Sequence, residues 1–363
     1  MIQTEEIKAS IVEAAKKKKR KRCVQRVLKN ADEYAINLQQ TLNNGEWFPP
    51  EHEEHLLREG YHKKERMIQK PRWDNEQIVH HMLIRQLQPI IQPKLHRYVC
   101  GSIKGRGAHY LLKAMKSWVK GYGQKRFYAA ELDIRKFYDN IDLHILKGKL
   151  DKLIRDRAFK EVLFRVIGDG DKGLPKGFYT SPWLAHYYLL GADNYIQQEL
   201  KPDHYARYVD NIWLLHRNKR ELRKMMAALW AYLNRELHLS IKEDWQIFRF
   251  ENTEESHGRF INLLGFNIHR RHVGIRKGIL KRIRAKAMRI KRKGHVTFHD
   301  ASSVVSRMGY FKFADAHRFY LTHIKPYISI RYLKWIIRKH TRQGGIANDR
   351  LENCRGRQQA RPC

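Results

Sequence analysis

The spacing of apolar residues along the chain predicts an alternation of helices and strands. Apolar positions recur every three or four residues in the longest segments, which predicts helices over 24–42, 76–99, 222–237 and 276–293. Shorter helices are expected over 108–120, 145–154 and 181–200. Runs of β-branched and aromatic residues predict strands instead, the clearest being 127–133, 206–215 and 262–268.

The segment 206–215 contains the most informative turn. Two runs of strand-forming residues flank Asp210-Asn211. Asp and Asn tolerate a positive φ, so the pattern predicts a hairpin whose two-residue turn is Asp210-Asn211. This turn would lift the Asp210 carboxylate out of the pleat, where solvent or a metal ion can reach it. The alternative is a surface hairpin with an ordinary turn aspartate.

A second carboxylate, Asp133, ends the predicted strand 127–133. Phosphoryl and nucleotidyl transfer can use two Mg²⁺ ions roughly 3.5–4 Å apart, which clamp the attacking and leaving oxygens. Each Mg²⁺ ion takes one or two carboxylates together with water and substrate phosphates. Two aspartates on adjacent strands, without a His or Cys ligand set, therefore suit this ion.

Composition bears on the partners of the protein rather than on its fold. The 363 residues carry a net charge of +36 and can form two or three subdomains. A polyanion is the expected partner. A membrane surface is the competing one, but no stretch approaches about 18 uninterrupted apolar residues, and no signal-peptide segment is recognisable. The four cysteines form no CxxC pair and no zinc spacing, which favours a reducing, cytoplasmic compartment.

Basic residues gather in two segments. The segment 16–22 (KKKKRKR) fits a nuclear address, a solvated face or a nucleic-acid arm. The segment 276–293 has ten Lys or Arg among its eighteen residues, most of them opposite an apolar stripe. Such a helix can pack on a subdomain and follow a nucleic-acid backbone, with membrane-surface binding as the alternative. The candidate contacts to that backbone are Lys281, Arg284, Lys286 and Lys291.

Three further segments contain turn or cap signals. In 100–109, Arg106 lies between two glycines, which permits close approach of the backbone to a phosphate. The segment 168–173 does not match a P-loop, because no Gly-Lys-Ser/Thr opens a helix there. In 174–185, Ser181 can cap a helix and Pro182 suits its first position.

These motifs, in this order, resemble those of reverse transcriptases over about residues 60–335. The segments 133–141 (DIRKFYDNI) and 208–211 (YVDN) are similar to the two metal-binding motifs of the family's palm. The other similar segments are 63–73 in the fingers, 105–109 (GRGAH), 174–184 (LPKGFYTSPWL), 237–242 (LHLSIK) and 263–266 (LLGF). Two positions depart from the family pattern: Asn211 replaces its usual second Asp, and Lys176 replaces its Gln.

The resemblance implies a right-hand polymerase. Its fold would be mixed α/β (α+β), with fingers, an antiparallel palm sheet and a helical thumb. The implied regions are a basic N-terminal helical region, the fingers, the catalytic palm, the thumb and a disordered tail, at 1–45, 46–126, 127–270, 271–340 and 341–363.

The resemblance also implies RNA-templated DNA synthesis, in which a primer 3′-hydroxyl attacks the α-phosphate of a dNTP. Asp133 and Asp210 would hold two Mg²⁺ ions, for which Mn²⁺ can substitute. Asn211 would be a weak ligand or would hydrogen-bond a ligand. Positively charged side chains suit a triphosphate, and the implied nucleotide contacts are Lys64, Arg66, Arg72, Lys176, Gly177 and Lys242.

Three other residues receive roles from the resemblance. Tyr138 would pack under the deoxyribose and leave no room for a 2′-hydroxyl, with a plain core position as the alternative. Arg106, beside its glycines, and Gly265, in the primer-grip hairpin, would contact the nucleic acid.

Within the family, the chain is similar to compact bacterial and phage enzymes. The segments 105–109, 206–210 (ARYVD) and 309–317 (GYFKFADAH) resemble those of diversity-generating retroelements, and stand-alone enzymes of phage defence fit as well. The implied partners are an RNA template, an RNA/DNA hybrid, dNTPs and an accessory subunit, with no membrane. The rival hypothesis is a catalytically weak nucleic-acid-binding scaffold, or a template-independent polymerase, on the same fold.

Overall fold

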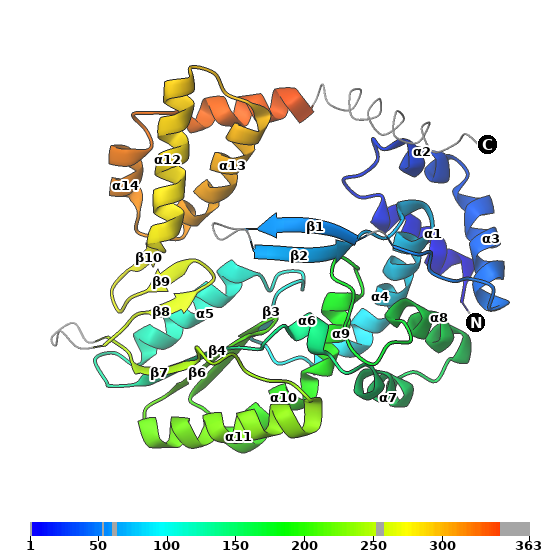
Figure 1. Cartoon of the computed structure of the whole chain (residues 1–363), viewed down its shortest axis with the longest axis horizontal. Helices are drawn as coiled ribbons and strands as arrows, with labels where there is room; N and C mark the ends of the chain where they lie inside the picture. The colour runs from blue at the N-terminus through cyan, green and yellow to red at the C-terminus, as the bar shows by residue number, and fades with distance from the viewer. Residues whose placement is uncertain (1, 53, 60–63, 252–257, 342–363) are drawn as a thin grey trace. The chain divides into compact units, whose positions relative to one another are not determined.

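The structure, a computed structural model, describes residues 2–52, 54–59, 64–251 and 258–341. The chain forms two compact units (Figure 1). The first contains 1–107 and 128–247, and the second contains 108–127 and the chain from 248 onward. The five regions predicted from the sequence stay a prediction, because this division is coarser and cuts the chain at other positions.

The sheet of the first unit consists of β3 (Val99–Cys100), β4 (Tyr128–Asp133), β5 (His204–Tyr208), β6 (Asn211–His216) and β7 (Gln246–Arg249). Their order is β3-β5-β6-β4-β7, and the chain leaves the first unit within β7. The centre of the sheet is antiparallel, as predicted, because β6 pairs with both β4 and β5 in that sense. The two-residue edge strand β3 joins β5 in parallel, which the sequence did not predict.

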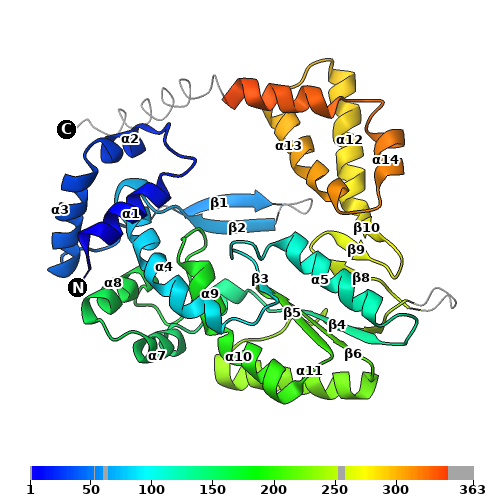
Figure 2. The same ribbon diagram turned by 180° about the vertical axis from the view of Figure 1, so that it is seen from behind.

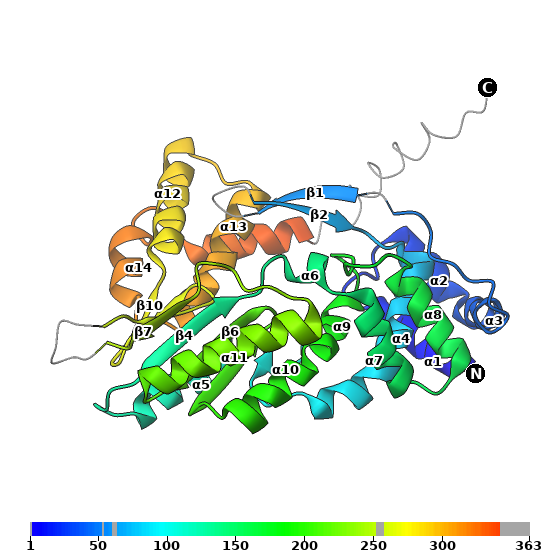
Figure 3. The same ribbon diagram turned by 60° about the horizontal axis from the view of Figure 1, so that its bottom comes forward.

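Helix α11 (Lys219–Leu237) lies along one face of this sheet (Figure 3). Asn218 caps its start, because the side chain accepts from the backbone N–H groups of Arg220 and Glu221. The apolar stripe predicted for this helix is confirmed except at Trp230, which is 41% exposed rather than part of the core. Its buried members are Leu222, Met226, Leu229, Leu233 and Leu237.

The other helices of the first unit are shorter. They are α1 (Thr4–Ala14), α2 (Arg22–Lys29), α3 (Ala31–Asn43), α4 (Ile78–Ile91), α6 (Phe137–Asn140), α7 (Leu143–Leu153), α8 (Arg157–Ile167), α9 (Ser181–Tyr188) and α10 (Leu190–Tyr195). Two π-helical turns, Trp73–Gln77 and Ile196–Leu200, and a 3₁₀ turn, Gln92–Lys94, extend them. Helices α1 to α4 gather with α7 and α8 (Figures 1 and 2). A separate hairpin is formed by β1 (Glu54–Glu59) and β2 (Lys64–Gln69).

Several helix predictions need correction. The predicted helix over 24–42 is two helices, α2 and α3, which meet at the non-helical Asn30. The predicted cap at Ser181 is wrong, because the helix begins at that residue and its Oγ donates to the carbonyl of Pro175 at 2.6 Å. Helices α1 and α8 were not predicted, although the buried residues of α8 have helical spacing.

The second unit begins with α5 (Ala108–Gly121) and continues with a three-stranded antiparallel sheet. The strands are β8 (Ile261–Leu263), β9 (Phe266–Ile268) and β10 (Val273–Ile275), and the helices after them are α12 (Lys277–Lys293), α13 (Phe298–Met308) and α14 (His317–His323). A 3₁₀ turn, Gly309–Lys312, follows α13, and a last helix covers 330–341. The apolar stripe predicted for 276–293 is confirmed, with Ile279, Ile283, Ala287 and Ile290 buried.

Within the described residues, no helix combines the length and the apolar composition needed to cross a lipid bilayer.

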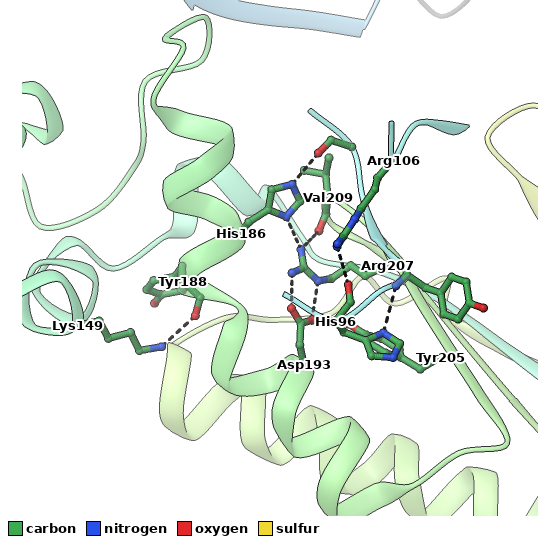
Figure 4. Close-up of polar contacts among 11 residues, drawn as sticks. His96, Arg106, Lys149, His186, Tyr188, Asp193, Tyr205, Arg207 and Val209 are labelled. Carbon is green, nitrogen blue, oxygen red and sulfur yellow. Dashed lines mark hydrogen bonds and ion pairs between the residues drawn. The ribbon is translucent and has the colours of Figure 1, made fainter. Parts of the chain in front are cut away.

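A buried ion pair between β5 and α10 fixes the β5–β6 hairpin (Figure 4). Arg207 of β5 donates from Nε and Nη2 to the Asp193 carboxylate of α10, at 2.7 and 2.5 Å. Both side chains are only 1% exposed. Tyr205 donates its hydroxyl to the same carboxylate. The remaining nitrogen of Arg207, Nη1, donates to the backbone oxygen of Val209 at 2.9 Å.

His186 completes this network. Burial and the charge of Arg207 lower the pKa of His186 to about 3, so its imidazole is neutral. The neutral ring can accept from Arg207 at Nδ1, 3.2 Å away, and donate from Nε2 to the carbonyl of Gly101 at 2.8 Å. Burial alone would lower the pKa of Arg207, but Asp193 and Tyr205 raise it overall. The guanidinium therefore stays charged inside the unit.

Removing one partner of this pair should destabilise the protein strongly. Asp193→Ala leaves the buried Arg207 charge without compensation, which typically costs about 3–5 kcal/mol. The double variant with Arg207→Met should recover part of that loss, because no unpaired charge remains. The free energy of unfolding in urea checks both.

The matched control for this test is the exposed pair Arg157–Glu161, whose side chains are 91% and 45% exposed. Glu161→Ala should change the stability by less than about 1 kcal/mol. A loss for Asp193→Ala no larger than this control would contradict the structural role given to the buried pair.

Candidate functional site

The turn between β5 and β6 carries the first predicted carboxylate, but not in the predicted register. Tyr208 pairs with Asn211, so the two turn residues are Val209 and Asp210. Asn211 begins β6 rather than belonging to the turn. Val209 has a φ of 57°, which is unusual for a β-branched residue and stores backbone strain.

The neighbouring loop holds Val209 in this conformation. Its backbone N–H donates to the carbonyl of Cys100 at 3.1 Å, and its own carbonyl accepts from Arg207. A Cβ at Gly101 would lie 2.6 Å from Cγ2 of Val209, so only glycine fits there. The strained turn is therefore fixed from two sides, and Asp210 follows it directly.

Asp133 reaches the same place from β4. It lies opposite Asn211 in the β4–β6 register. The backbone N–H of Ile134 donates to the carbonyl of Asp210 at 3.2 Å. The segment that ends at Lys242 also pairs with the end of β4, because the N–H of Lys242 donates to the carbonyl of Asp133 at 2.9 Å. Three chain segments thus converge on the two carboxylates.

The charges at this point are not balanced within the protein. Burial and the neighbouring Asp133 carboxylate raise the pKa of Asp210. Lys242 donates from Nζ to Oδ2 of Asp133, whereas Oδ1 of Asp133 is buried without a hydrogen-bond partner. Asn211 donates from Nδ2 to Oδ1 of Asp210 at 3.1 Å. A buried carboxylate oxygen without a partner is costly, and a bound cation would remove that cost.

These residues fit a divalent cation that also uses substrate oxygens. Among the described residues, no group of three or more His, Cys, Asp or Glu forms a complete metal-binding set. A cation that takes one or two carboxylates and completes its shell with water and phosphate needs no such set. The donor set of Asp133 and Asp210 suits that behaviour, and the neutral amide of Asn211 is the weaker donor.

Tyr138 lies close to this pair of carboxylates. It belongs to the short helix α6, which follows β4 after Lys136, a residue with a φ of 43°. Burial and then the charge of Asp210 raise the pKa of Tyr138 to about 12, so its hydroxyl stays protonated. Phe137 beside it is buried in the core, whereas Tyr138 is only partly buried. Tyr138 therefore lies beside Asp210, and its predicted sugar-sensing role stays a prediction.

Lys176 and Gly177 connect this region with the β1–β2 hairpin. Lys176 Nζ lies 2.7 Å from the carboxylate of Asp139, the residue after Tyr138. The carbonyl of Lys176 accepts from the N–H of Gln69 in β2 at 2.9 Å. Gly177 has a φ of 111°, and a Cβ there would lie 2.3 Å from the carbonyl oxygen of Gln69. Gly177 is therefore required by the approach of β2, a requirement that the sequence did not show.

The remaining predicted contacts of the first unit lie on β2 and in two loops. Arg66 lies exposed on β2, and the side chain of Lys64 lies outside what the structure describes. Arg72 lies 3.6 Å from Asp74 in an ion pair. Arg106 donates from Nη1 to the carbonyl of His96 at 3.1 Å, so it also closes its own loop. The triphosphate and nucleic-acid roles of these residues stay predictions.

The predicted residues of the second unit divide into buried and exposed ones. A Cβ at Gly265 would lie 2.8 Å from Ile279 and 2.9 Å from Tyr310, so this glycine permits close packing. Lys281 and Arg284 are exposed on α12. Lys286 instead lies 2.6 Å from Asp300 in an ion pair, which gives it a structural partner. Lys291 lies over the ring of Tyr327, 5.5 Å from its centroid.

Sequence reasoning missed the residues that position the site. Arg207 was visible only as part of the ARYVD motif, and Asp193 and His186 were not singled out at all. A charged residue between apolar ones in a central strand was the available signal. Its partner on α10 could not be identified without the fold.

Comparisons with known proteins identify the family of the chain. A model of the family "Reverse transcriptase (RNA-dependent DNA polymerase)" matches residues 57–268. The chain is 26% identical over 169 residues to the group II intron-encoded protein LtrA of Lactococcus lactis subsp. cremoris, and equally to that of strain MG1363. This match covers 44% of the chain and 27% of the relative, so the chain spans about a quarter of the length of these curated relatives.

Two telomerases are among the similar solved structures. One is telomerase from Candida albicans in complex with a TWJ fragment of telomeric RNA, at 13% identity and a TM-score of 0.47, covering 90% of this chain and 65% of that one. The other is apo telomerase from Candida tropicalis, at 13% identity and a TM-score of 0.48, covering 77% and 56%.

The family match extends over more than half of the chain and includes Asp133, Tyr138, Asp210 and Lys242. The mixed α/β polymerase fold predicted from the sequence is thereby confirmed. The chain belongs to the reverse transcriptase family, the RNA-dependent DNA polymerases.

Proposed function

We propose that the chain copies RNA into DNA with two Mg²⁺ ions held by Asp133 and Asp210. One observation carries this proposal: the two carboxylates meet at strand ends, and Oδ1 of Asp133 is buried there without a partner. Burial, and after it the neighbouring Asp133 carboxylate, raise the pKa of Asp210, and a cation beside the two carboxylates would favour their charged forms. Divalent metal use is general in the family, and the all-oxygen donor set favours Mg²⁺.

Each residue of the site then has a task. When bound, the ions supply positive charge for the attacking 3′-oxygen and the leaving pyrophosphate. Asp133 and Asp210 fix the place of that charge, and Asn211 keeps the Asp210 carboxylate oriented through its hydrogen bond. The Lys242 ammonium can stabilise the negative charge that develops on the pyrophosphate. Tyr138 limits the space under the sugar.

The basic side chains on β2 and the loop 174–177 extend this site toward the triphosphate. Lys176 and Arg66 present charge on two segments that are hydrogen-bonded to each other. The exposed Lys281 and Arg284 of α12 offer contacts to the phosphates of an RNA/DNA hybrid. These contacts recognise the charge of the phosphates rather than the base sequence, which suits an enzyme that must move along its template.

The proposed setting is a prokaryotic retroelement. The similarity to a group II intron-encoded protein supports it, as do the three segments that resemble diversity-generating retroelements. Extension of an oligo(dT) primer on poly(rA) with dTTP and Mg²⁺ tests the activity itself. A folded protein that incorporates no dTTP with either Mg²⁺ or Mn²⁺ would overturn the proposal.

Removal of either carboxylate should abolish incorporation. Asp133→Ala and Asp210→Ala each take away a charge that the ions require, while template binding should stay within about twofold, because the basic surfaces are unchanged. Mg²⁺ should raise the Tm of the wild type but not of either variant, since only a site that binds metal is stabilised by it.

The matched control is Asp151→Ala, which removes an exposed carboxylate paired with Lys160 on α8. It should keep both the activity and the Mg²⁺-dependent rise in Tm. Wild-type incorporation by either site variant would show that the metal site lies elsewhere.

The Asn211→Asp variant tests whether the amide is tolerated or marks a decayed enzyme. The substitution removes the donor to Asp210 and adds a third negative charge. We expect a lower Tm without metal, tighter Mg²⁺ binding, and a changed rate or Mg²⁺/Mn²⁺ preference. Activity should already be present in the wild type. A wild type that is inactive with both ions, together with an active variant, would support the scaffold hypothesis instead.

Tyr138→Ala should weaken the discrimination against ribonucleotides. Without the ring, space opens beneath the sugar and a 2′-hydroxyl fits. We expect the ratio of kcat/KM for dTTP to that for UTP to fall about tenfold or more, equivalent to about 1.4 kcal/mol. Tyr138→Phe keeps the ring and should keep the ratio. An unchanged ratio in a folded, active Tyr138→Ala variant would remove this role.

A further inference from the structure

The last helix of the second unit, over 330–341, exposes two aromatic rings that support each other. It is the orange-red helix beside α12 and α13 in Figure 2. Tyr332 and Trp335 are 50% and 51% exposed. Their ring centroids lie 5.7 Å apart with 17° between the planes, so the rings are stacked. Lys339 places its Nζ 5.2 Å from the Trp335 centroid.

These rings do not anchor the helix to its own unit. Leu333 is fully buried in a cluster with Ile283 of α12 and Val304 of α13. Ile330, Ile336 and Ile337 pack against the same cluster. The helix is therefore held by one face, while Tyr332 and Trp335 remain accessible. Large apolar groups that stay exposed beside each other commonly mark a binding surface.

The charge around the rings identifies the kind of partner. The segment 330–341 contains no Asp or Glu. Its four Lys and Arg side chains are all exposed, namely Arg331, Lys334, Arg338 and Lys339. We call Tyr332, Trp335 and these four cations the aromatic–basic face. Rings that can stack, placed among cations, are the chemistry of single-strand nucleic-acid binding: bases lie on the rings and phosphates contact the cations.

We propose that the aromatic–basic face binds single-stranded nucleic acid. A paired base is already stacked between its neighbours, so an accessible ring surface favours an unpaired base over a duplex. Stacking accepts any base, and the face should bind RNA and DNA strands of varied sequence. This face shares no residue with the carboxylate site or with the exposed cations of α12, and its binding needs no catalysis.

The test is fluorescence anisotropy with the full chain carrying Asp133→Ala, so that no synthesis occurs. The probes are labelled 20-nucleotide oligo(rU) and oligo(dT) and a blunt RNA/DNA hybrid of the same length. Replacing both Tyr332 and Trp335 by Ala should weaken binding of the single strands at least tenfold, about 1.4 kcal/mol. Binding of the blunt hybrid should change less than twofold.

Two controls separate stacking from folding and from charge. Trp335→Phe keeps a ring and should retain most of the affinity for single strands. Trp230→Ala removes another exposed tryptophan, 41% exposed on α11, and should change nothing. Lys334→Gln with Arg338→Gln should flatten the salt dependence, whereas the ring variants should keep its slope, because stacking releases no counterions.

Several results would overturn the proposal. One is unchanged single-strand binding by the double Ala variant. Another is an equal loss for the blunt hybrid, or a Trp335→Phe variant that binds single strands as weakly as the double Ala variant. The last is a double Ala variant that keeps its single-strand binding but loses binding to vesicles of phosphatidylcholine and phosphatidylserine at 4:1. That result would assign the face to a membrane surface. Because binding is measured without synthesis, an inactive polymerase would leave this result interpretable.

Discussion

The buried Arg207–Asp193 pair is the interaction on which the site depends. A charged pair inside a protein is retained only when nearly all of its hydrogen-bonding capacity is used, and here Tyr205, His186 and the carbonyl of Val209 use it. The bond to Val209 matters most, because that residue holds a positive φ that a β-branched side chain disfavours. The strain is offset by the network, and its result is the placement of Asp210.

The charge balance around Asp133 and Asp210 is the reason that these residues suit a cation. Two carboxylates face one lysine and one amide, so one negative charge and one buried oxygen remain unmatched. A third carboxylate at position 211 would increase the repulsion in the metal-free state. Asn211 therefore lowers the electrostatic cost of folding the site, although its amide would be a weaker metal ligand than a carboxylate. The sequence motif alone shows only that the family's usual second Asp is missing.

The sequence predicted the parts of this protein that depend on local patterns. The strands ending in Asp133 and flanking Asp210, the stripe of α11 and the basic helix α12 all follow from spacing and residue type. The sequence did not predict the features that depend on contacts between segments far apart in the chain. The turn register moved by one residue because Gly101 and Cys100, about a hundred positions away, hold Val209. The ion pair of Lys286 with Asp300 could not be predicted either, because helical periodicity does not show which residues of another helix lie nearby.

The residues proposed to contact the sugar and the phosphates share a structural support. The loop carrying Lys176 and Gly177 accepts a hydrogen bond from β2 and pairs with Asp139, next to Tyr138. Two residues earlier, the N–H of Leu174 donates to the carbonyl of Tyr138 at 2.8 Å. A displacement of the β1–β2 hairpin would therefore pull on the backbone that carries the tyrosine. In the proposed function, contact with the triphosphate and exclusion of the 2′-hydroxyl are therefore mechanically linked, so a change at Gly177, where no Cβ fits, would disturb both.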